Sequence, residues 1–271
     1  MLRHLACLKN VIFCCFLIGI IFSFICSAKA QEQEWNIEKS KHFIIYYRDV
    51  SSEYINRTVK EAEDYYDTIT DYLGFNRYGS WTWNNRCKIY LYRDLDDYQK
   101  NVGAASWSRG HVNVIKKEIS TYIWREKFFD TILPHEMAHI IFREFVGFDK
   151  NLPLWLDEGV ACSQEIDNAE RLAIGRYLIA LKLYVPFEGF SDVRIPDLVM
   201  PFIFYSQSAG MVNFLLENFG RKRFVNFCRR VRDKADWKES LLSVYRFSDL
   251  EEFEKTWVDH LSKGIVTKGV E

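Results

Sequence analysis

The sequence predicts an α+β fold, in which a small mixed N-terminal lobe precedes a mostly helical C-terminal lobe. Stretches rich in β-branched and aromatic residues are concentrated before about residue 120. Beyond that point, apolar residues recur at the three- and four-residue spacing of helices. The first thirty residues resemble neither region, because they combine basic residues with a long apolar run and contain no acid. We therefore expect three regions, residues 1–30, 31–120 and 121–271.

Residues 1–30 have the three-part layout of a secretory signal peptide. Basic residues precede an apolar run over residues 11–26, and a small-x-small site ends at Ala30. The run has about 16 residues, fewer than the roughly 20 that a membrane-spanning helix needs, and no second run of this kind follows. We expect cleavage after Ala30, export to the periplasm or the extracellular space, and no stable membrane span afterwards. An uncleaved N-terminal membrane anchor is the alternative.

Composition excludes several classes of protein. The chain has 36 Lys and Arg against 37 Asp and Glu, so no basic field exists to attract nucleic acid, and we expect no nucleic-acid partner. Four of the seven cysteines lie in the leader, which leaves Cys87, Cys162 and Cys228. Three cysteines allow one disulfide at most and exclude a disulfide-rich scaffold; whether any two of them pair is left open.

The N-terminal lobe is expected to contain three strands and a long helix. Residues 42–47, 87–92 and 111–115 have strand composition, and the last of these is expected to form an edge of the sheet. Apolar residues over 52–73 recur at steps of four and three, and Gly74 follows as a C-terminal stop. This pattern predicts a helix with one buried face.

The C-terminal lobe is expected to be helical almost throughout. Helical patterns cover residues 128–145, 156–165, 169–183, 205–219 and 223–232. A final helix opens with the capping box Ser248-Asp-Leu-Glu251 and carries apolar residues on one face. No linker rich in Pro, Gly or Ser separates the lobes, so we expect them to pack together.

The first helical segment of this lobe contains His135-Glu136-Met-Ala-His139. A spacing of four residues places both histidines on one helix face, where their imidazoles can bind one metal ion, and Glu136 lies beside them to act on water. Apolar residues flank the motif, which indicates a buried helix whose His and Glu side chains need compensating partners. Two histidines on a helix flank without a metal are the alternative.

A catalytic zinc ion takes three protein ligands and leaves a position for water, so a third ligand is needed. A His-x-x-Gly-x-x-His continuation is excluded, because Phe142 and Phe145 occupy the positions of its Gly and second His. Instead the chain contains Pro-Leu-Trp-Leu-Asp-Glu-Gly-Val-Ala, in which 18 residues separate Glu158 from His139. That interval is long enough for the chain to turn and begin a second helix alongside the first.

The combination of His-Glu-x-x-His, 18 residues and Trp-Leu-x-Glu-Gly-x-Ala resembles the gluzincin metallopeptidases. The likeness is to the exported bacterial peptidase MA-like proteins in particular, and more distantly to thermolysin and the zinc aminopeptidases. It implies a gluzincin fold with one Zn²⁺ ion on His135, His139 and Glu158. It also implies hydrolysis of an amide by zinc-activated water, with Glu136 as the general base.

A second block, Phe-Tyr205-Ser-Gln-Ser, is similar to the Tyr-x-Gln-Ser helix of the same peptidases. The resemblance implies that the Tyr205 hydroxyl stabilises the oxyanion of the tetrahedral intermediate. Packing alone is the alternative role for this tyrosine.

Two features depart from the family pattern. Cys162 stands where related sequences often carry an acid behind the glutamate ligand; Glu165 is a candidate replacement, and Cys162 otherwise fills the core. The Gly-x-Met-Glu-Asn stretch with which the aminopeptidases bind a free N-terminus is missing, and residues 103–110 stand in its place.

We therefore expect an exported zinc metallopeptidase, an endopeptidase, whose peptide or protein substrate adds as an extra strand at residues 111–115. His111 itself is expected to be an incidental surface histidine. The alternatives are a non-catalytic binding or scaffold protein that retains a gluzincin fold, and a zinc hydrolase that acts on cell-wall peptides.

Overall fold

The computed structural model describes residues 34–75, 81–103, 109–123, 127–148, 152–193, 201–234 and 236–266. The described residues from Asn36 onward belong to one compact unit. The predicted signal peptide, residues 1–30, lies outside the described residues. Within the described ranges, no helix combines the length and the apolar character needed to cross a membrane. The lobe boundary between residues 120 and 121 stays a prediction.

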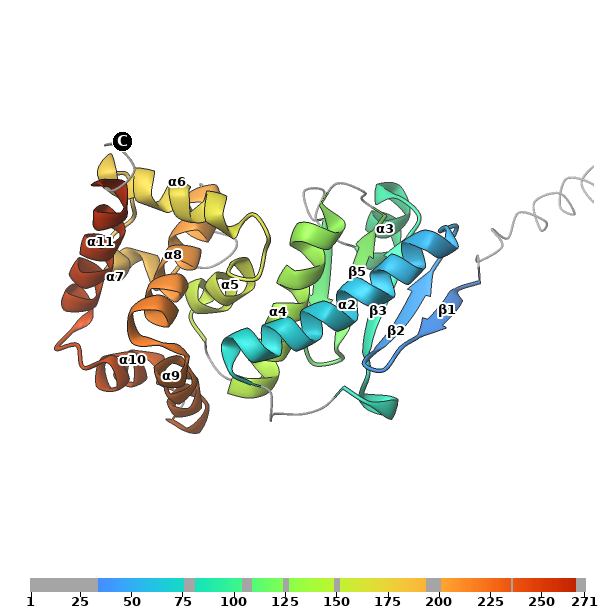
Figure 1. Ribbon diagram of the computed structural model, residues 1–271, viewed down its shortest axis with the longest axis horizontal. Helices are drawn as coiled ribbons and strands as arrows, with labels where there is room; N and C mark the ends of the chain where they lie inside the picture. The colour runs from blue at the N-terminus through green and yellow to red at the C-terminus, as the bar shows by residue number, and fades with distance from the viewer. Residues whose placement is uncertain are drawn as a thin grey trace, which may run out of the picture. The chain divides into compact units, whose positions relative to one another are not determined.

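The first part of the compact unit is a mixed sheet (Figure 1). Its strands, as far as the chain is described, run in the order β1-β2-β3-β5-β4, with β2 parallel to β3, β3 parallel to β5, and antiparallel strands at both edges. The bounds are β1 Asn36–Lys39, β2 Phe43–Tyr47, β3 Cys87–Tyr92, β4 Gly110–Asn113 and β5 Glu118–Tyr122. The expected edge strand is confirmed as β4, which begins one residue before the predicted range and ends two residues before its end. Strands β1 and β5 were not predicted.

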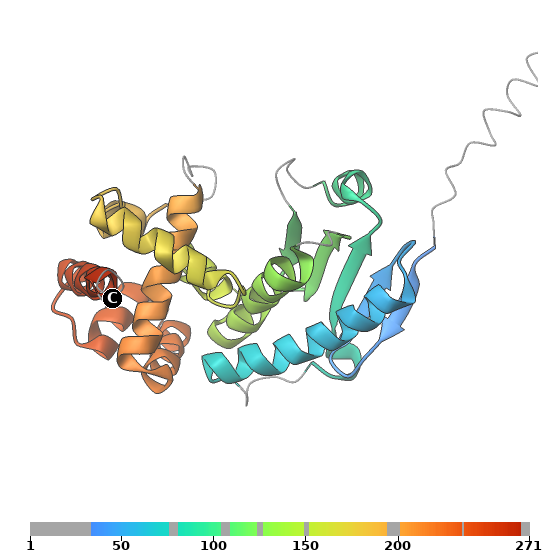
Figure 2. The same cartoon turned by 45° about the horizontal axis from the view of Figure 1, so that its top comes forward.

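Helices α2 (Ser52–Leu73) and α4 (Leu133–Val146) lie side by side against this sheet (Figures 1 and 2). Helix α2 has its predicted bounds, because the Ser51 hydroxyl accepts a hydrogen bond from the Tyr54 amide at its start. At its end Gly74 adopts the left-handed conformation with φ of 77°, which a glycine allows without strain. The short helix α3, Leu95–Val102, was not predicted.

The remainder of the compact unit is helical, as predicted. The bounds are α5 Leu154–Cys162, α6 Asn168–Ala180, α7 Phe187–Phe190, α8 Pro201–Phe219, α9 Arg221–Lys234, α10 Trp237–Tyr245 and α11 Leu250–Val266. Helices α7 and α10 were not predicted. The expected capping box is displaced by one residue: Asp249 caps the Glu252 amide, and the Glu252 side chain accepts from the Ser248 amide.

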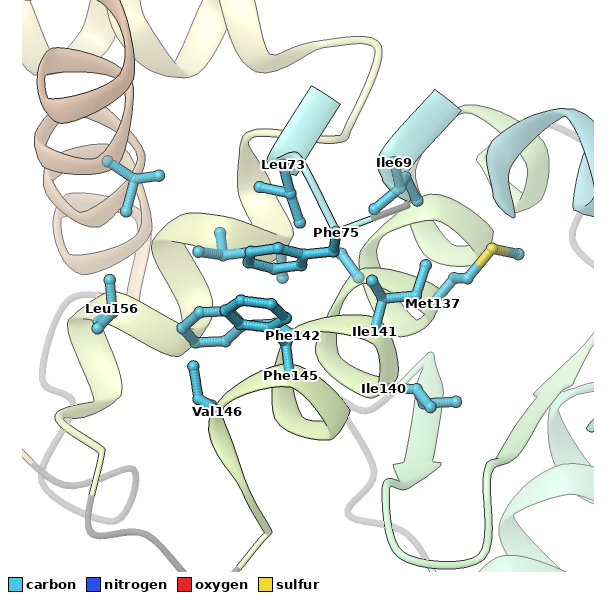
Figure 3. Close-up of a cluster of buried hydrophobic side chains, with 14 of the residues drawn as sticks. Ile69, Leu73, Phe75, Met137, Ile140, Ile141, Phe142, Phe145, Val146 and Leu156 are labelled. Atoms are coloured by element: carbon cyan, nitrogen blue, oxygen red, sulfur yellow. The ribbon is translucent and has the colours of Figure 1, made fainter. Parts of the chain in front are cut away.

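The predicted helix over 128–145 begins differently from expectation. Residues Phe128–Ile132 form a π-helical turn, and the α-helix starts only at Leu133. From there, α4 packs its apolar side against the end of α2 and against α5 (Figure 3). The rings of Phe75 and Phe145 stack in this cluster with centroids 3.8 Å apart. Because this face is anchored, the polar side chains of α4 are held in a fixed direction.

Candidate metal centre

His135 and His139 lie one turn apart on α4, as the spacing predicts. Pro134 stands in the first turn, where its missing amide hydrogen leaves no helical bond unmade. The two Nε2 atoms are 3.2 Å apart, and the rings are nearly perpendicular at 79°. Both histidines therefore direct the same ring nitrogen toward one location.

Glu158, on α5, supplies an oxygen at that location. Its Oε2 atom lies 3.4 Å from His135 Nε2 and 3.6 Å from His139 Nε2. This oxygen is buried and makes no hydrogen bond of ordinary geometry. Three atoms at these separations can all lie about 2 Å from one common point, which is the distance that zinc keeps from nitrogen and oxygen ligands. The three side chains fit a single zinc ion.

Charge at this location also favours a cation. Burial by itself would lower the pKa of His139, but Asp157 and Glu158 outweigh it and raise that pKa to about 10. Burial would raise the pKa of Glu158, but His139 and His135 hold it well below its usual range. The carboxylate thus stays ionised and stabilises positive charge between these groups, whether protons or a metal ion carry it.

Gly159 explains why α5 can bring Glu158 to this point. A Cβ atom at Gly159 would lie 2.4 Å from the Ser208 carbonyl oxygen of α8, so a larger residue would push the two helices apart. Helix α8 is itself fixed by Gln207, whose side chain bonds both the amide and the carbonyl of Val185. Gly159 of the first motif therefore allows α5 to pack closely on α8, and Gln207 of the second motif fixes α8 to the chain at Val185.

His135 has a carboxylate partner on its other ring nitrogen. Its Nδ1 donates to Glu165 Oε1 at 2.7 Å, and Glu165 Oε2 accepts from Arg171 at 2.6 Å. The sequence suggested Glu165 as a replacement acid behind Glu158; the structure places it behind His135 instead. Cys162 is buried beside the same pair, with the donor atoms of the three groups within 4.8 Å of one another. Burial raises the pKa of the Cys162 thiol, so it remains protonated.

His139 has a matching arrangement that was not predicted. Its Nδ1 lies 3.2 Å from Asp157 Oδ1, and Arg143 donates two hydrogen bonds to Asp157 Oδ2 at 3.0 and 2.7 Å. Arg143 stands four residues after His139 on α4. From this spacing alone, the sequence could have indicated that an arginine lies beside this histidine. Carboxylates that accept from Nδ1 fix the ring orientation and leave Nε2 free to bind a metal.

Glu136, the predicted base, lies on the side of α4 that faces strand β4. A Cβ atom at Gly110 would be 2.6 Å from its Oε1 atom, so the strand backbone runs directly beside the carboxylate. Burial raises the pKa of Glu136, and both histidines oppose this effect. The carboxylate therefore lies near both histidines and also beside the edge of the sheet.

Tyr205, the predicted oxyanion residue, is half-buried in the first turns of α8. Burial raises the pKa of its hydroxyl, and the charge of Glu158 raises it further, which places this side chain within electrostatic range of the centre. The hydroxyl is therefore a hydrogen-bond donor at neutral pH. Its role in stabilising an oxyanion stays a prediction.

The three cysteines that follow residue 30 are buried and free, so the disulfide left open by the sequence does not form; they are Cys87, Cys162 and Cys228.

Comparison with known proteins places this site in a family. No curated protein matches the chain. The family described as the peptidase MA superfamily matches residues 80–263, a range that contains both histidines, Glu136, Glu158 and Tyr205. This range is more than half of the chain, and membership indicates a peptidase-like hydrolase of a typically metal-dependent kind. The chain belongs to the peptidase MA superfamily.

Proposed function

We propose that this protein is an exported zinc-dependent metallopeptidase that cleaves within peptide chains. The observation that carries the proposal is the convergence of two Nε2 atoms and one carboxylate oxygen on a common point, with a further carboxylate, Glu136, beside them. Two imidazoles and one carboxylate are a donor set typical of catalytic zinc. Asp157 and Glu165 complete the set by orienting the two rings.

The residues of the site have separate roles in amide hydrolysis. Zinc held by His135, His139 and Glu158 would supply a Lewis acid that polarises the carbonyl and makes water a better nucleophile. Glu136 takes the proton from the attacking water and passes it to the leaving amine; its raised pKa suits this exchange. Tyr205, which keeps its proton, donates a hydrogen bond to the oxygen on which negative charge develops.

Strand β4 supports an extended peptide as the substrate. It is an edge of the sheet and passes beside Glu136 through Gly110. A peptide that pairs with its main chain would lie along the sheet edge with its backbone next to the base. Such pairing is independent of a free N-terminus, and this favours endopeptidase action.

Cleavage experiments with a matched control test the proposal. Glu136→Gln should retain zinc but lose hydrolysis of a diverse peptide library, because the amide cannot accept the proton. Glu188→Gln, at an exposed position on α7, should cleave as the wild type does. A chelator should abolish wild-type cleavage and added zinc should restore it. Full activity in Glu136→Gln would contradict the role of the base, and zinc binding without cleavage by the wild type would indicate a binding protein.

Export is proposed from the layout of residues 1–30. Fractionation of cells that express the full chain should recover a protein that begins at Gln31 outside the cytoplasm. An intact N-terminus in the membrane fraction would indicate the anchor instead.

A further inference from the structure

Arg171 connects two parts of the metal centre that come from different helices. It lies on α6, and its Nε donates to Glu165 Oε2 at 2.6 Å. Its guanidinium carbon also lies 5.8 Å from the centroid of the Tyr205 ring on α8. A planar guanidinium can bond a carboxylate along its edge while its face lies against an aromatic ring. One side chain therefore contacts both the partner of His135 and the tyrosine.

Glu165 depends on this contact because its side chain is only 1% exposed. A carboxylate buried to this extent requires a charged partner to remain ionised. Each of its two oxygens accepts one hydrogen bond, Oε2 from Arg171 and Oε1 from His135 Nδ1. The orientation of the carboxylate, and through it that of the His135 ring, is set by both bonds.

We propose that Arg171 is a positioning residue of the metal centre. It holds Glu165 against His135, so that Nε2 of this histidine points at the site shared with His139 and Glu158. It also keeps the Tyr205 ring in place beside that site. The inference rests on the proposed function, but its first test reads metal binding and not catalysis.

Zinc affinity of the mature protein, measured by competition with a chromogenic chelator, tests the route through Glu165. Arg171→Met and Glu165→Gln should each weaken zinc binding by about 10- to 100-fold, the range found when partners of metal-binding histidines are removed. The double variant should bind zinc no more weakly than the weaker single variant, because both changes break the same connection. It also removes both buried charges, so it remains measurable if Arg171→Met does not fold. Losses that multiply in the double variant would overturn the proposal.

Two further variants separate positioning from general packing. Arg171→Lys keeps a cation beside Glu165 and should recover at least about tenfold of the lost affinity. Arg223→Met removes another arginine that lies over an aromatic ring, that of Phe219, and should leave zinc affinity unchanged. Equal losses in Arg171→Met and Arg223→Met would show a general packing effect and overturn the proposal.

Turnover at saturating zinc tests the contact with Tyr205. Arg171→Met should lower kcat by about tenfold with little change in KM, since a displaced hydroxyl stabilises the transition state less well. In a Tyr205→Phe background the same change should have no further effect on kcat. A further loss there would contradict action through Tyr205. A wild-type protein that neither binds zinc nor cleaves peptides would refute the proposed function, whereas an active wild type matched by Arg171→Met would refute this inference alone.

Discussion

Each histidine of the candidate metal centre has a carboxylate next to its Nδ1 atom, and each of these carboxylates accepts a hydrogen bond from an arginine. The spacing within one helix was sufficient to predict that His135 and His139 share a helix face, because residues four apart do so. Their metal-binding role and that of Glu136 as a base stay predictions. Glu158 could be predicted only from the likeness to a family, since its position depends on how two helices pack. The pairing of Asp157 with His139 could not be predicted from the sequence, because it depends on which side of α5 faces α4.

Gly110 lets the backbone of strand β4 approach Glu136 closely. Gly110→Ala would place a methyl group 2.6 Å from Glu136 Oε1, so the carboxylate or the strand must move. We expect kcat to fall by about tenfold or more, because a base displaced from its working position transfers protons poorly, while zinc content stays unchanged. Steady-state kinetics and metal analysis check this. Wild-type turnover in Gly110→Ala would show that the strand does not set the position of the base.

At the scale of elements, regular amphipathic segments were predictable and short ones were not. Helix α2 was predicted with its bounds, since it combines a long periodic pattern with a cap at each end. Strand β1 was missed because all four of its residues are exposed, so it has no apolar alternation. Helix α3 buries a single residue, Tyr98, too few to produce a period. These elements form because of strand pairing or helix capping. Neither of these produces a hydrophobic pattern in the sequence.

The close packing of α5 on α8 requires that residue 159 have no side chain. Gly159→Ala would set a Cβ 2.4 Å from a backbone oxygen of α8, which cannot rotate away. We expect the free energy of unfolding to fall by about 1–3 kcal/mol, as overpacked cores show, and zinc affinity to fall with it because Glu158 is adjacent. Gly189→Ala, where nothing lies within 4 Å of the added atom, should leave stability unchanged or raise it by up to about 1 kcal/mol. Equal stability of the two variants would contradict this account of α5.

For the molecule as a whole, charged side chains connect the sheet to the helices around the centre. Glu144 of α4 forms an ion pair with Lys117, in the turn that joins β4 to β5, and accepts a hydrogen bond from Trp81 at 2.5 Å. Together with the contact at Gly110, this pair holds the edge strand on α4, the helix that carries His135 and His139. The order of the five strands could not be predicted, because it depends on pairings between distant segments.

A second connection predicts how stability depends on pH. Glu63 of α2 accepts hydrogen bonds from the amide and the ring of His42, at 2.9 and 2.6 Å. Burial would raise the pKa of Glu63, but the nearby Ser40 hydroxyl and the hydrogen bonds from His42 outweigh it and lower that pKa. The stabilisation is therefore present above the unfolded-state pKa of about 4.3 and is lost as the pH falls through the lower folded-state value.

Unfolding free energies from pH 6 to pH 3, with a chelator present, check this expectation. The difference between the wild type and Glu63→Gln should shrink as the pH falls below about 4.3. A difference that stays constant over this range would contradict the contribution of the ionised carboxylate.

We propose above all that His135, His139 and Glu158 together hold one zinc ion. Native mass spectrometry of the purified protein, with the zinc content of the same sample determined independently, measures how many zinc ions each chain holds. We expect one zinc ion per wild-type chain and a substantial loss from Glu158→Gln, because an amide oxygen is a poorer ligand than a carboxylate. A wild-type protein without zinc, or a Glu158→Gln variant that keeps one zinc ion per chain, would show that these three residues do not hold the ion together.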